Sequence, residues 1–315
     1  MNPRLPAVVA ALIGLTGPAL AQGDSTQAES PGIGPLAFAW PVPCEARVTQ
    51  RDQKDGKDMT MRYTVRLARA QRGEDLEIRF TKFEVLRFNG QDMTGPEAKM
   101  AMAAQLPMLQ AAYPQIRIAR TGEYLGIPDW EGHVDRTLAM MRDLGRSDPQ
   151  VLEGTRNMML NPQYRSMLQS KSGEFWQVWV SAWLGAEIAE GETLEGLTEI
   201  PIGEELVEAK LSLHHLGAIG EGHVRLGMKT VLEGEQARRA FLKVMKAMAS
   251  QGPKPLDGEI PLEAFSKKTK LSVVTDPKTL QPREAKIESL MSISMKGEGS
   301  REKVEKREYA FEWGE

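Results

Sequence analysis

Cysteine is nearly absent from the chain, because Cys44 is the only one among 315 residues. A single thiol cannot close an intramolecular disulfide, so the hydrophobic core has to supply the stability. An excess of charge of one sign is also lacking, since 40 Lys and Arg side chains stand against 43 Asp and Glu. This balance gives no electrostatic reason to expect nucleic acid or an anionic membrane surface as a partner.

Long apolar runs are absent except near the N-terminus, where one extends from Ala7 to Leu20 behind Arg4. It is shorter than the roughly 20 residues of a membrane-spanning helix, and Ala19-Leu20-Ala21 offers the small residues that signal peptidase accepts. We therefore predict a signal peptide over residues 1–21, export to the periplasm or the extracellular space, and no membrane span after cleavage. Residues 22–36 are rich in Gly, Ser, Gln and Pro and are predicted to be a flexible linker.

Alternating apolar and polar residues predict strands in both outer parts of the remaining chain, residues 37–315, which we expect to form a single domain. The alternation is regular from Met59 to Leu67, and a change of phase at Thr81-Lys82 indicates a β-bulge. We expect strands over residues 45–120 and, with one inserted helix, over 205–315. Because strands of parallel sheets have continuous apolar runs, the alternation favours an antiparallel sheet with one covered face.

Pairs of a side-chain acceptor and a proline punctuate the middle of the chain and predict helices over residues 129–190. Asp148-Pro149 and Asn161-Pro162 each place an acceptor before a proline that lacks an N–H, and Asp129 precedes a further helix. The predicted fold class is α+β, with a curved, half-barrel-like antiparallel sheet covered by the helical middle segment.

Motifs that would identify a reaction or a cofactor are absent. The sequence contains no Gly-x-Ser-x-Gly, no His-Glu-x-x-His and no Cys-x-x-Cys, and its glycines have neither the dinucleotide nor the P-loop spacing. We expect no catalytic residues and no cofactor, which favours a non-catalytic protein over an enzyme.

Three histidines surround a predicted hairpin and leave a metal-assisted hydrolase open as an alternative. Pairing of Leu213 with Leu226 would place His214 and His223 on the polar face as diagonal neighbours and would turn His215 toward the core. Two imidazoles can begin a Zn or Cu site, but a closed site needs more ligands, and the spacing provides none. Surface histidines without a metal are the other interpretation.

Large, soft side chains suggest an apolar cleft. Such side chains fill cores, and they also suit a surface that fits varied apolar ligands. Methionine is frequent, with 17 residues that include the pairs Met140-Met141 and Met158-Met159. If a cleft lies between the sheet and the helices, we expect it to be lined by Trp176, Trp179, Trp183, Met100 and Phe241.

The strands on either side of Asp276-Pro277-Lys278-Thr279-Leu280-Gln281-Pro282, together with Tyr309–Trp313, resemble a layout seen in uncharacterised secreted bacterial proteins. The layout is also similar, more distantly, to periplasmic lipoprotein carriers such as LolA and LolB. This resemblance implies a curved sheet around an apolar cavity that is closed by helices and holds acyl chains. The large helical middle departs from that pattern, so no binding residue is carried over.

The function expected from the sequence is therefore that of a non-catalytic, exported envelope protein. In its most specific form, it binds an apolar or lipid-like ligand between the sheet and the helices. An envelope interaction or scaffold protein with a fully packed core and a protein partner is the alternative.

Overall fold

The computed structural model describes residues 32–33, 35–71, 73–103, 106, 113–145, 148–203, 205–250 and 260–314. The predicted signal peptide and most of the predicted linker lie outside the described residues. Within them, no helix is both long and apolar enough to cross a membrane.

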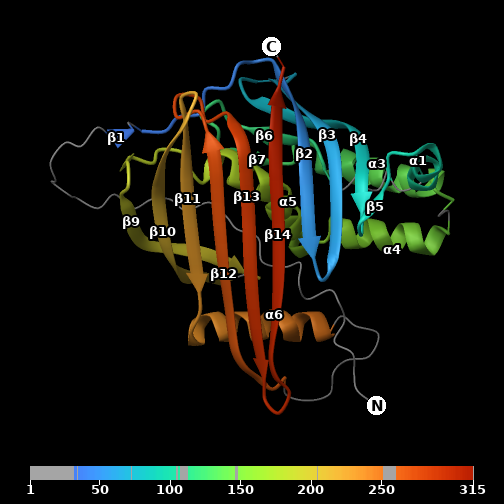
Figure 1. The fold of residues 1–315 in the computed structure, drawn as a ribbon. Helices are drawn as coiled ribbons and strands as arrows, with labels where there is room; N and C mark the ends of the chain where they lie inside the picture. The colour runs from blue at the N-terminus through green and yellow to red at the C-terminus, as the bar shows by residue number, and fades with distance from the viewer. Residues whose placement is uncertain are drawn as a thin grey trace.

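A curved antiparallel sheet, with 12 strands among the described residues, forms the body of the molecule (Figure 1). Its strand order is β7-β6-β4-β3-β2-β14-β13-β12-β11-β10-β9, and the short β5 pairs with β4. The strands are β2 (Cys44–Lys54), β3 (Lys57–Arg69), β4 (Leu76–Phe88), β5 (Gln91–Asp92), β6 (Ile116–Ile118), β7 (Tyr124–Gly126), β9 (Thr193–Ile202), β10 (Glu205–Gly220), β11 (His223–Leu232), β12 (Leu262–Thr275), β13 (Pro282–Met295) and β14 (Gly299–Trp313). A separate ribbon pairs β1 (Gly32–Ile33) with β8 (Ile188–Ala189). The predicted α+β class with a curved antiparallel sheet is confirmed.

The first and last long strands meet in the middle of the sheet. β14 pairs with β2, so that Tyr309 lies opposite Gln50 and Arg307 opposite Asp52. This pairing joins two up-and-down meanders, one from each outer part of the chain, into one continuous sheet. Side chains from opposite ends of the sequence therefore share one face.

The predicted cap residues begin the middle helices. Asp129 accepts a hydrogen bond from Gly132 N at 3.0 Å, Asp148 accepts one from Gln150 N at 2.8 Å, and Asn161 accepts one from Tyr164 N at 3.3 Å. These contacts satisfy backbone donors that the first helical turn leaves without a partner. The helices are α1 (Pro96–Ala103), α3 (Trp130–Asp143), α4 (Pro149–Leu160), α5 (Pro162–Trp176) and α6 (Glu235–Ser250).

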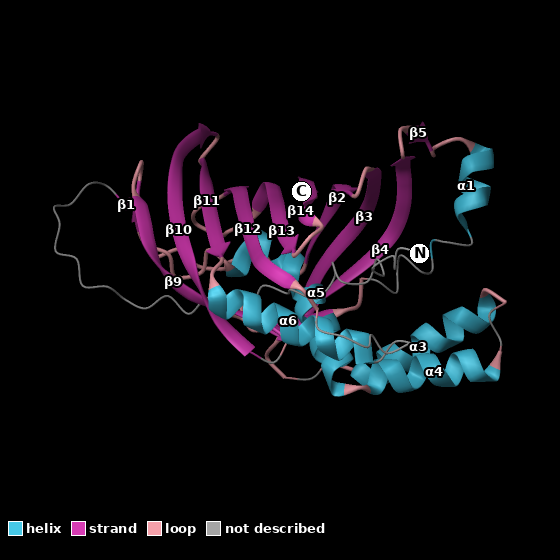
Figure 2. Ribbon diagram, turned by 90° about the horizontal axis from the view of Figure 1, so that it is seen from below, coloured by secondary structure: helices cyan, strands magenta, loops and turns pink. Residues whose placement is uncertain are grey.

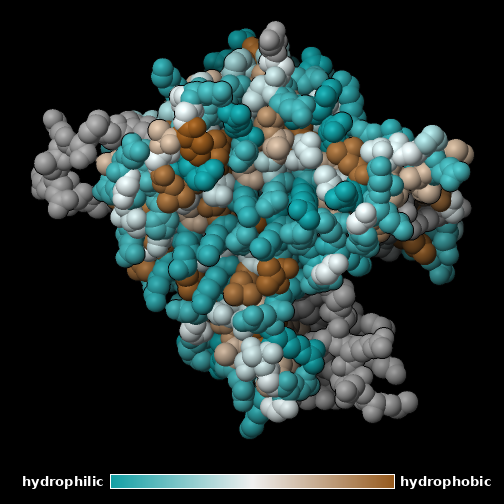
Figure 3. Space-filling view, in the orientation of Figure 1, coloured by the Kyte–Doolittle hydropathy of each residue, from teal (hydrophilic) through white to brown (hydrophobic). Residues whose placement is uncertain are grey.

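The helices α3 to α6 lie on one side of the sheet (Figure 2). We call the sheet face toward them the inner face. α6 packs on β10 and β12, and the π-helix that follows α5 (Gln177–Ser181) packs on β12 and β13. The opposite, outer face is mainly hydrophilic (Figure 3), with ion pairs such as Lys286 to Glu308 at 3.1 Å.

The segment that carries the three tryptophans changes its helical geometry inside the core. α5 ends at Trp176 and continues as a π-helix over Gln177–Ser181, whose first four residues are all buried. This π-helical turn lies within the main hydrophobic cluster, and the sequence pattern did not predict it.

The structure confirms the predicted β-bulge but not the predicted register of the histidine hairpin. The predicted bulge is confirmed, since β3 pairs with β4 through Arg62 and Glu84 and then through Thr64 and Thr81, and Lys82 has a φ of 55°. The predicted register of the histidine hairpin is wrong, because Leu213 lies opposite Met228 rather than Leu226.

The cause is the length of β10. This strand continues to Gly220, with irregular pairing between His215 and Gly220, before a tight turn at Glu221-Gly222. Both turn residues have positive φ, 52° and 75°, as a two-residue hairpin turn matching the strand twist requires. The extra residues on β10 shift every pair beyond the irregular segment.

Candidate functional site

A cavity of about 490 Å³ lies between helices α3, α4 and α5 and the inner face of the sheet. This volume is within the range of about 300–1,000 Å³ that is typical of ligand pockets. Apolar side chains dominate its wall, with charged groups near β14. The lining residues that matter below are Tyr113, Ile127, His133, Thr137, Met140, Met141, Thr155, Met158, Met159, Tyr164, Leu168, Lys171, Ser172, Glu174, Phe175, Arg307 and Tyr309.

The cavity separates two hydrophobic clusters. The α3–α4 pair has a small core of its own, in which Trp130, Val134 and Leu138 pack with Leu152 and Met159. The main core lies between the sheet and the segment from α5 into the π-helix. The cavity wall takes Phe175 and Tyr309 from the main core, and Ile127 and Met159 from the small one. The helix pair is therefore a wall that packs within itself and leaves space toward the sheet.

Methionines form much of the wall on the helix side. Met140 and Met141 come from α3, and Met158 and Met159 from α4. Their unbranched thioether side chains have several rotatable bonds and can follow ligands of irregular shape. This part of the wall is apolar and adaptable.

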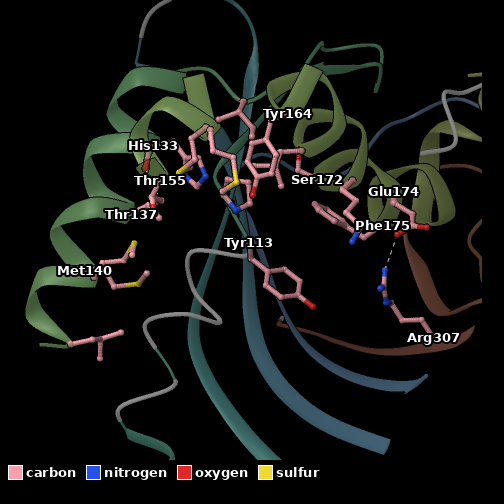
Figure 4. A pocket seen from close by; sticks show the side chains of 18 of the residues that line it. Tyr113, His133, Thr137, Met140, Thr155, Tyr164, Ser172, Glu174, Phe175 and Arg307 are labelled. Carbon is pink, nitrogen blue, oxygen red and sulfur yellow. Dashed lines mark hydrogen bonds and ion pairs between the residues drawn. The ribbon is translucent and has the colours of Figure 1, made fainter. Parts of the chain in front are cut away.

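The opposite end of the cavity carries a charged network, in which Arg307 reaches Glu174 (Figure 4) and also binds Asp52. Arg307 Nε donates to Asp52 Oδ1 at 2.7 Å, and its Nη1 donates to Glu174 Oε2 at 3.1 Å. Asp52 faces Arg307 across the β2–β14 pair, whereas Glu174 comes from α5. The network thus ties the sheet to the helix that closes over it.

Electrostatics keep Glu174 ionised. Burial acts to raise the pKa of Glu174, but the nearby positive charges, Arg307 first, outweigh it and hold that pKa below its ordinary value. Burial also lowers the pKa of Lys267, and partial desolvation lowers that of Lys171, which is an exposed residue at this end of the cavity. The charged end is therefore partly desolvated and contains both signs of charge.

A chain of hydrogen bonds positions Asp52. Tyr63 Oη donates to Gln50 Oε1 at 2.8 Å, and Gln50 Nε2 donates to Asp52 Oδ2 at 2.8 Å. Tyr113 Oη, on the cavity wall, lies 2.8 Å from the same Nε2. Burial raises the pKa of Tyr63 and of Tyr113, so both phenols stay neutral. Gln50 is fully buried with its amide satisfied, which fixes the carboxylate that holds Arg307.

His133 lies at the end of the cavity far from Arg307, beside Thr137, Met140 and Thr155 (Figure 4). Its ring lies 5.7 Å from that of Trp130, and burial lowers its pKa. At neutral pH this imidazole is uncharged, so the charges of the lining are confined to the Arg307 end.

The five residues predicted to line a cleft do not share one. Trp176, Trp179 and Trp183 are fully buried in the main core, where Trp176 Nε1 donates to Gly122 O at 2.8 Å. Phe241 of α6 stacks on Phe265 with ring centroids 4.1 Å apart. Met100 is 79% exposed on α1, which lies beyond β4 and away from the other helices (Figure 2). None of the five lines the cavity.

The residues that do line it carried weak signals in the sequence. The pairs Met140-Met141 and Met158-Met159 stand out, but methionine on a helical face has the same pattern in a packed core. Arg307 offered a sharper signal. The apolar phase of Tyr309, Phe311 and Trp313, continued backward, places Arg307 and then Glu305 on the same covered face.

The two candidate metal-binding histidines are not neighbours. His214 lies opposite Gly227, four residues from His223 on β11, which separates them by roughly 14 Å at about 3.4 Å per residue. His214 Nδ1 lies 2.9 Å from Thr193 Oγ1, and His223 Nδ1 lies 3.0 Å from Glu221 O. In the described part of the chain, no three His, Cys, Asp or Glu residues are grouped to hold a metal ion. The predicted diagonal pair is wrong, although His215 does face the core, at 4% exposure.

No protein-family model matches the chain, and no curated protein is significantly similar to it in sequence. Among solved structures, the chain is similar to lipovitellin, in a structure described as "lipid-protein interactions in lipovitellin". That similarity has a TM-score of 0.38 at 10% sequence identity and covers 86% of this chain. The chain spans 25% of the lipovitellin chain.

Proposed function

We propose that the protein is a non-catalytic binding protein of the cell envelope, which holds an apolar, lipid-like ligand between its sheet and its helices. The observation that carries this proposal is the cavity of about 490 Å³, with apolar walls from two separate cores and with charge confined to one end. A lipid-like molecule has the same division into an apolar chain and a polar head. The apolar N-terminal run supports a location outside the cytoplasm.

Burial of the ligand chain supplies the driving force in this proposal. Each methylene that leaves water contributes about 0.8 kcal/mol. The methionine side chains adapt to the shape of the chain, and helices fix the backbone of the wall. Such a site favours a class of apolar ligands over one exact molecule.

Thr155→Trp tests this proposal by filling the cavity. Thr155 is part of the wall from α4, and an indole there would occupy space meant for the ligand. Displacement of a neutral fluorescent probe such as 1-aminoanthracene by dodecanoate would measure binding. We expect the affinity of the variant to fall at least about tenfold, which corresponds to about 1.4 kcal/mol.

Asn157→Trp is the matched control, because Asn157 is an exposed residue of the same helix and lies outside the lining. The control should bind like the wild type, and circular dichroism should give the same folded spectrum for all three proteins. Equal affinity of the wild type and of Thr155→Trp would contradict the proposal.

An interaction protein is a second candidate, favoured by β9, which pairs on one side only among the residues that the structure describes. Leu194 and Leu197 of β9 and Leu206 of the neighbouring β10 are exposed, Leu197 at 60%. An unpaired edge with apolar side chains can accept a strand from a partner. Crosslinked pull-down should then recover one defined protein with the wild type and lose it with Leu197→Lys. Recovery of a lone monomer from both would remove this candidate.

A further inference from the structure

Lys171 is a cation of the cavity lining without a carboxylate at salt-bridge distance among the residues that the structure describes. Arg307, the other cation of the lining, is held by both Asp52 and Glu174. Lys171 belongs to α5, one turn before Glu174. The charged end of the cavity thus keeps one ammonium group available for a ligand.

The carboxylates near this end are held by other cations. Lys54 pairs with Glu305 at 2.8 Å, and Lys303 pairs with Asp55 at 3.0 Å and with Glu305 at 3.5 Å. Lys267 interacts electrostatically with Glu174 and Glu305.

The electrostatic surroundings of Lys171 favour an anion. The pKa of Lys171 is lowered, first by desolvation and then by the positive charge of Lys54, and these effects together with Arg307 outweigh the opposing carboxylates of Glu174 and Glu305. A bound anion beside Lys171 would offset this repulsion. A bound cation would add to it.

Arg307 has donors left as well. A guanidinium carries five N–H groups, and the two carboxylates take hydrogen bonds from Nε and Nη1. The described residues give Nη2 no hydrogen bond. Carboxylates and phosphates are the groups that combine with such a donor and a neighbouring ammonium.

We propose that the cavity selects anionic single-chain amphiphiles, with the carboxylate or phosphate head at Lys171 and Arg307 and the chain along the methionine wall toward His133. Figure 4 shows the arrangement, with Arg307 and Glu174 at one end and His133, Thr137 and Met140 at the other. The uncharged far end offers nothing to a second charged group. This inference rests on the function proposed above and names its ligand class.

Four amphiphiles with the same twelve-carbon chain test the inference on the full-length wild-type protein. Dodecanoate and dodecyl phosphate are the anionic probes, dodecanol is the neutral one, and dodecyltrimethylammonium is the cationic one. Each would displace 1-aminoanthracene below its critical micelle concentration. We expect the anionic probes to bind at least about tenfold more tightly than dodecanol, as for one charge-assisted hydrogen bond, and the cationic probe to bind most weakly. The ratio of the two anionic affinities tells a carboxylate site from a phosphate site.

Substitutions then assign the preference to Lys171. Lys171→Gln should weaken the binding of dodecanoate much more than that of dodecanol and so reduce the preference for the anion, whereas Lys171→Arg should retain the preference. Lys210→Gln is the control, because Lys210 is an exposed cation outside the lining and pairs with Glu233. Equal binding of all four probes to the wild type would overturn this inference and leave the proposed function standing. Binding of none of them would overturn both.

Discussion

Arg307→Met should destabilise the protein through the two carboxylates that it leaves behind. Methionine keeps much of the length of the side chain and removes the guanidinium that binds Asp52 at 2.7 Å and Glu174 at 3.1 Å. The side chains of Asp52 and Glu174 are only 24% and 22% exposed, and that of Arg307 is 32% exposed. Neither carboxylate can recover full hydration without moving the α5 segment or the β2–β14 pair.

The expected magnitude lies between that of a buried ion pair and that of a surface ion pair. Removing one partner of a buried pair costs about 3–5 kcal/mol, whereas exposed pairs contribute about 0–1 kcal/mol. Because the network borders an open cavity, we expect a loss of about 2–3 kcal/mol in the free energy of unfolding at pH 7. With about 2–4 °C per kcal/mol for a chain of this order of size, the Tm should fall by about 5–10 °C.

The loss should also depend on pH. In the wild type the pKa of Glu174 is lowered below its unfolded value of about 4.3, so its contribution to stability is present above that pH and is lost as the pH falls. Without Arg307, burial acts on Glu174 with less opposition and its pKa rises. The difference between wild type and Arg307→Met should therefore narrow from pH 7 to pH 4.

Urea unfolding followed by tryptophan fluorescence at both pH values would measure the effect. Arg301→Met is the matched control on the same strand, because Arg301 is 67% exposed and pairs with Glu298 three residues away. It should cost less than about 0.5 kcal/mol. Equal losses for the two variants, or a difference that widens toward pH 4, would refute this reasoning.

Three further predictions concern packing. Gly122→Ala should lower the free energy of unfolding in urea by at least about 3 kcal/mol, because Gly122 has a φ of 92° and a Cβ there would lie 2.6 Å from Phe38 Cβ. Gly145→Ala is the control and should lower it by only about 1–2 kcal/mol, because Gly145 has a φ of 77° but open space around it. His215→Leu should stabilise the fold by about 1 kcal/mol, since both ring nitrogens are buried without a hydrogen-bond partner in the described residues, and a loss of stability would contradict this account. Burial raises the pKa of the Cys44 thiol to about 11, so Cys44 should react with iodoacetamide at pH 8 at least about tenfold more slowly in the native protein than in urea, and equal rates would show that the thiol is accessible.

Local patterns in the sequence were sufficient to predict most of the secondary structure discussed above. Alternation located the long strands, the change of phase at Thr81-Lys82 located a bulge, and Asp129, Asp148 and Asn161 marked helix starts. Each of these features is determined by residues that are close together in the sequence, so a pattern of a few residues is enough to predict it. The π-helix at Gln177–Ser181 had no such local signal in the sequence.

Long-range pairing and the cavity were beyond such patterns. The predicted register of the histidine hairpin was wrong because irregular pairing past His215 adds residues to β10. The alternation of apolar and polar residues does not show how many residues such an irregularity adds. The cavity exists because the α3–α4 pair packs within itself, and a methionine such as Met140 has the same helical spacing whether it faces a core or an open space. Arg307 reaches Glu174 only after β14 has paired with β2 and α5 has crossed the inner face.

Native mass spectrometry of the protein purified without detergent from the periplasm of a producing bacterium would show whether the cavity carries a lipid. We expect a one-to-one complex with an anionic single-chain lipid, which Asn157→Trp retains and Thr155→Trp loses. A clean mass of the unliganded protein, or the same bound mass in Thr155→Trp, would contradict it.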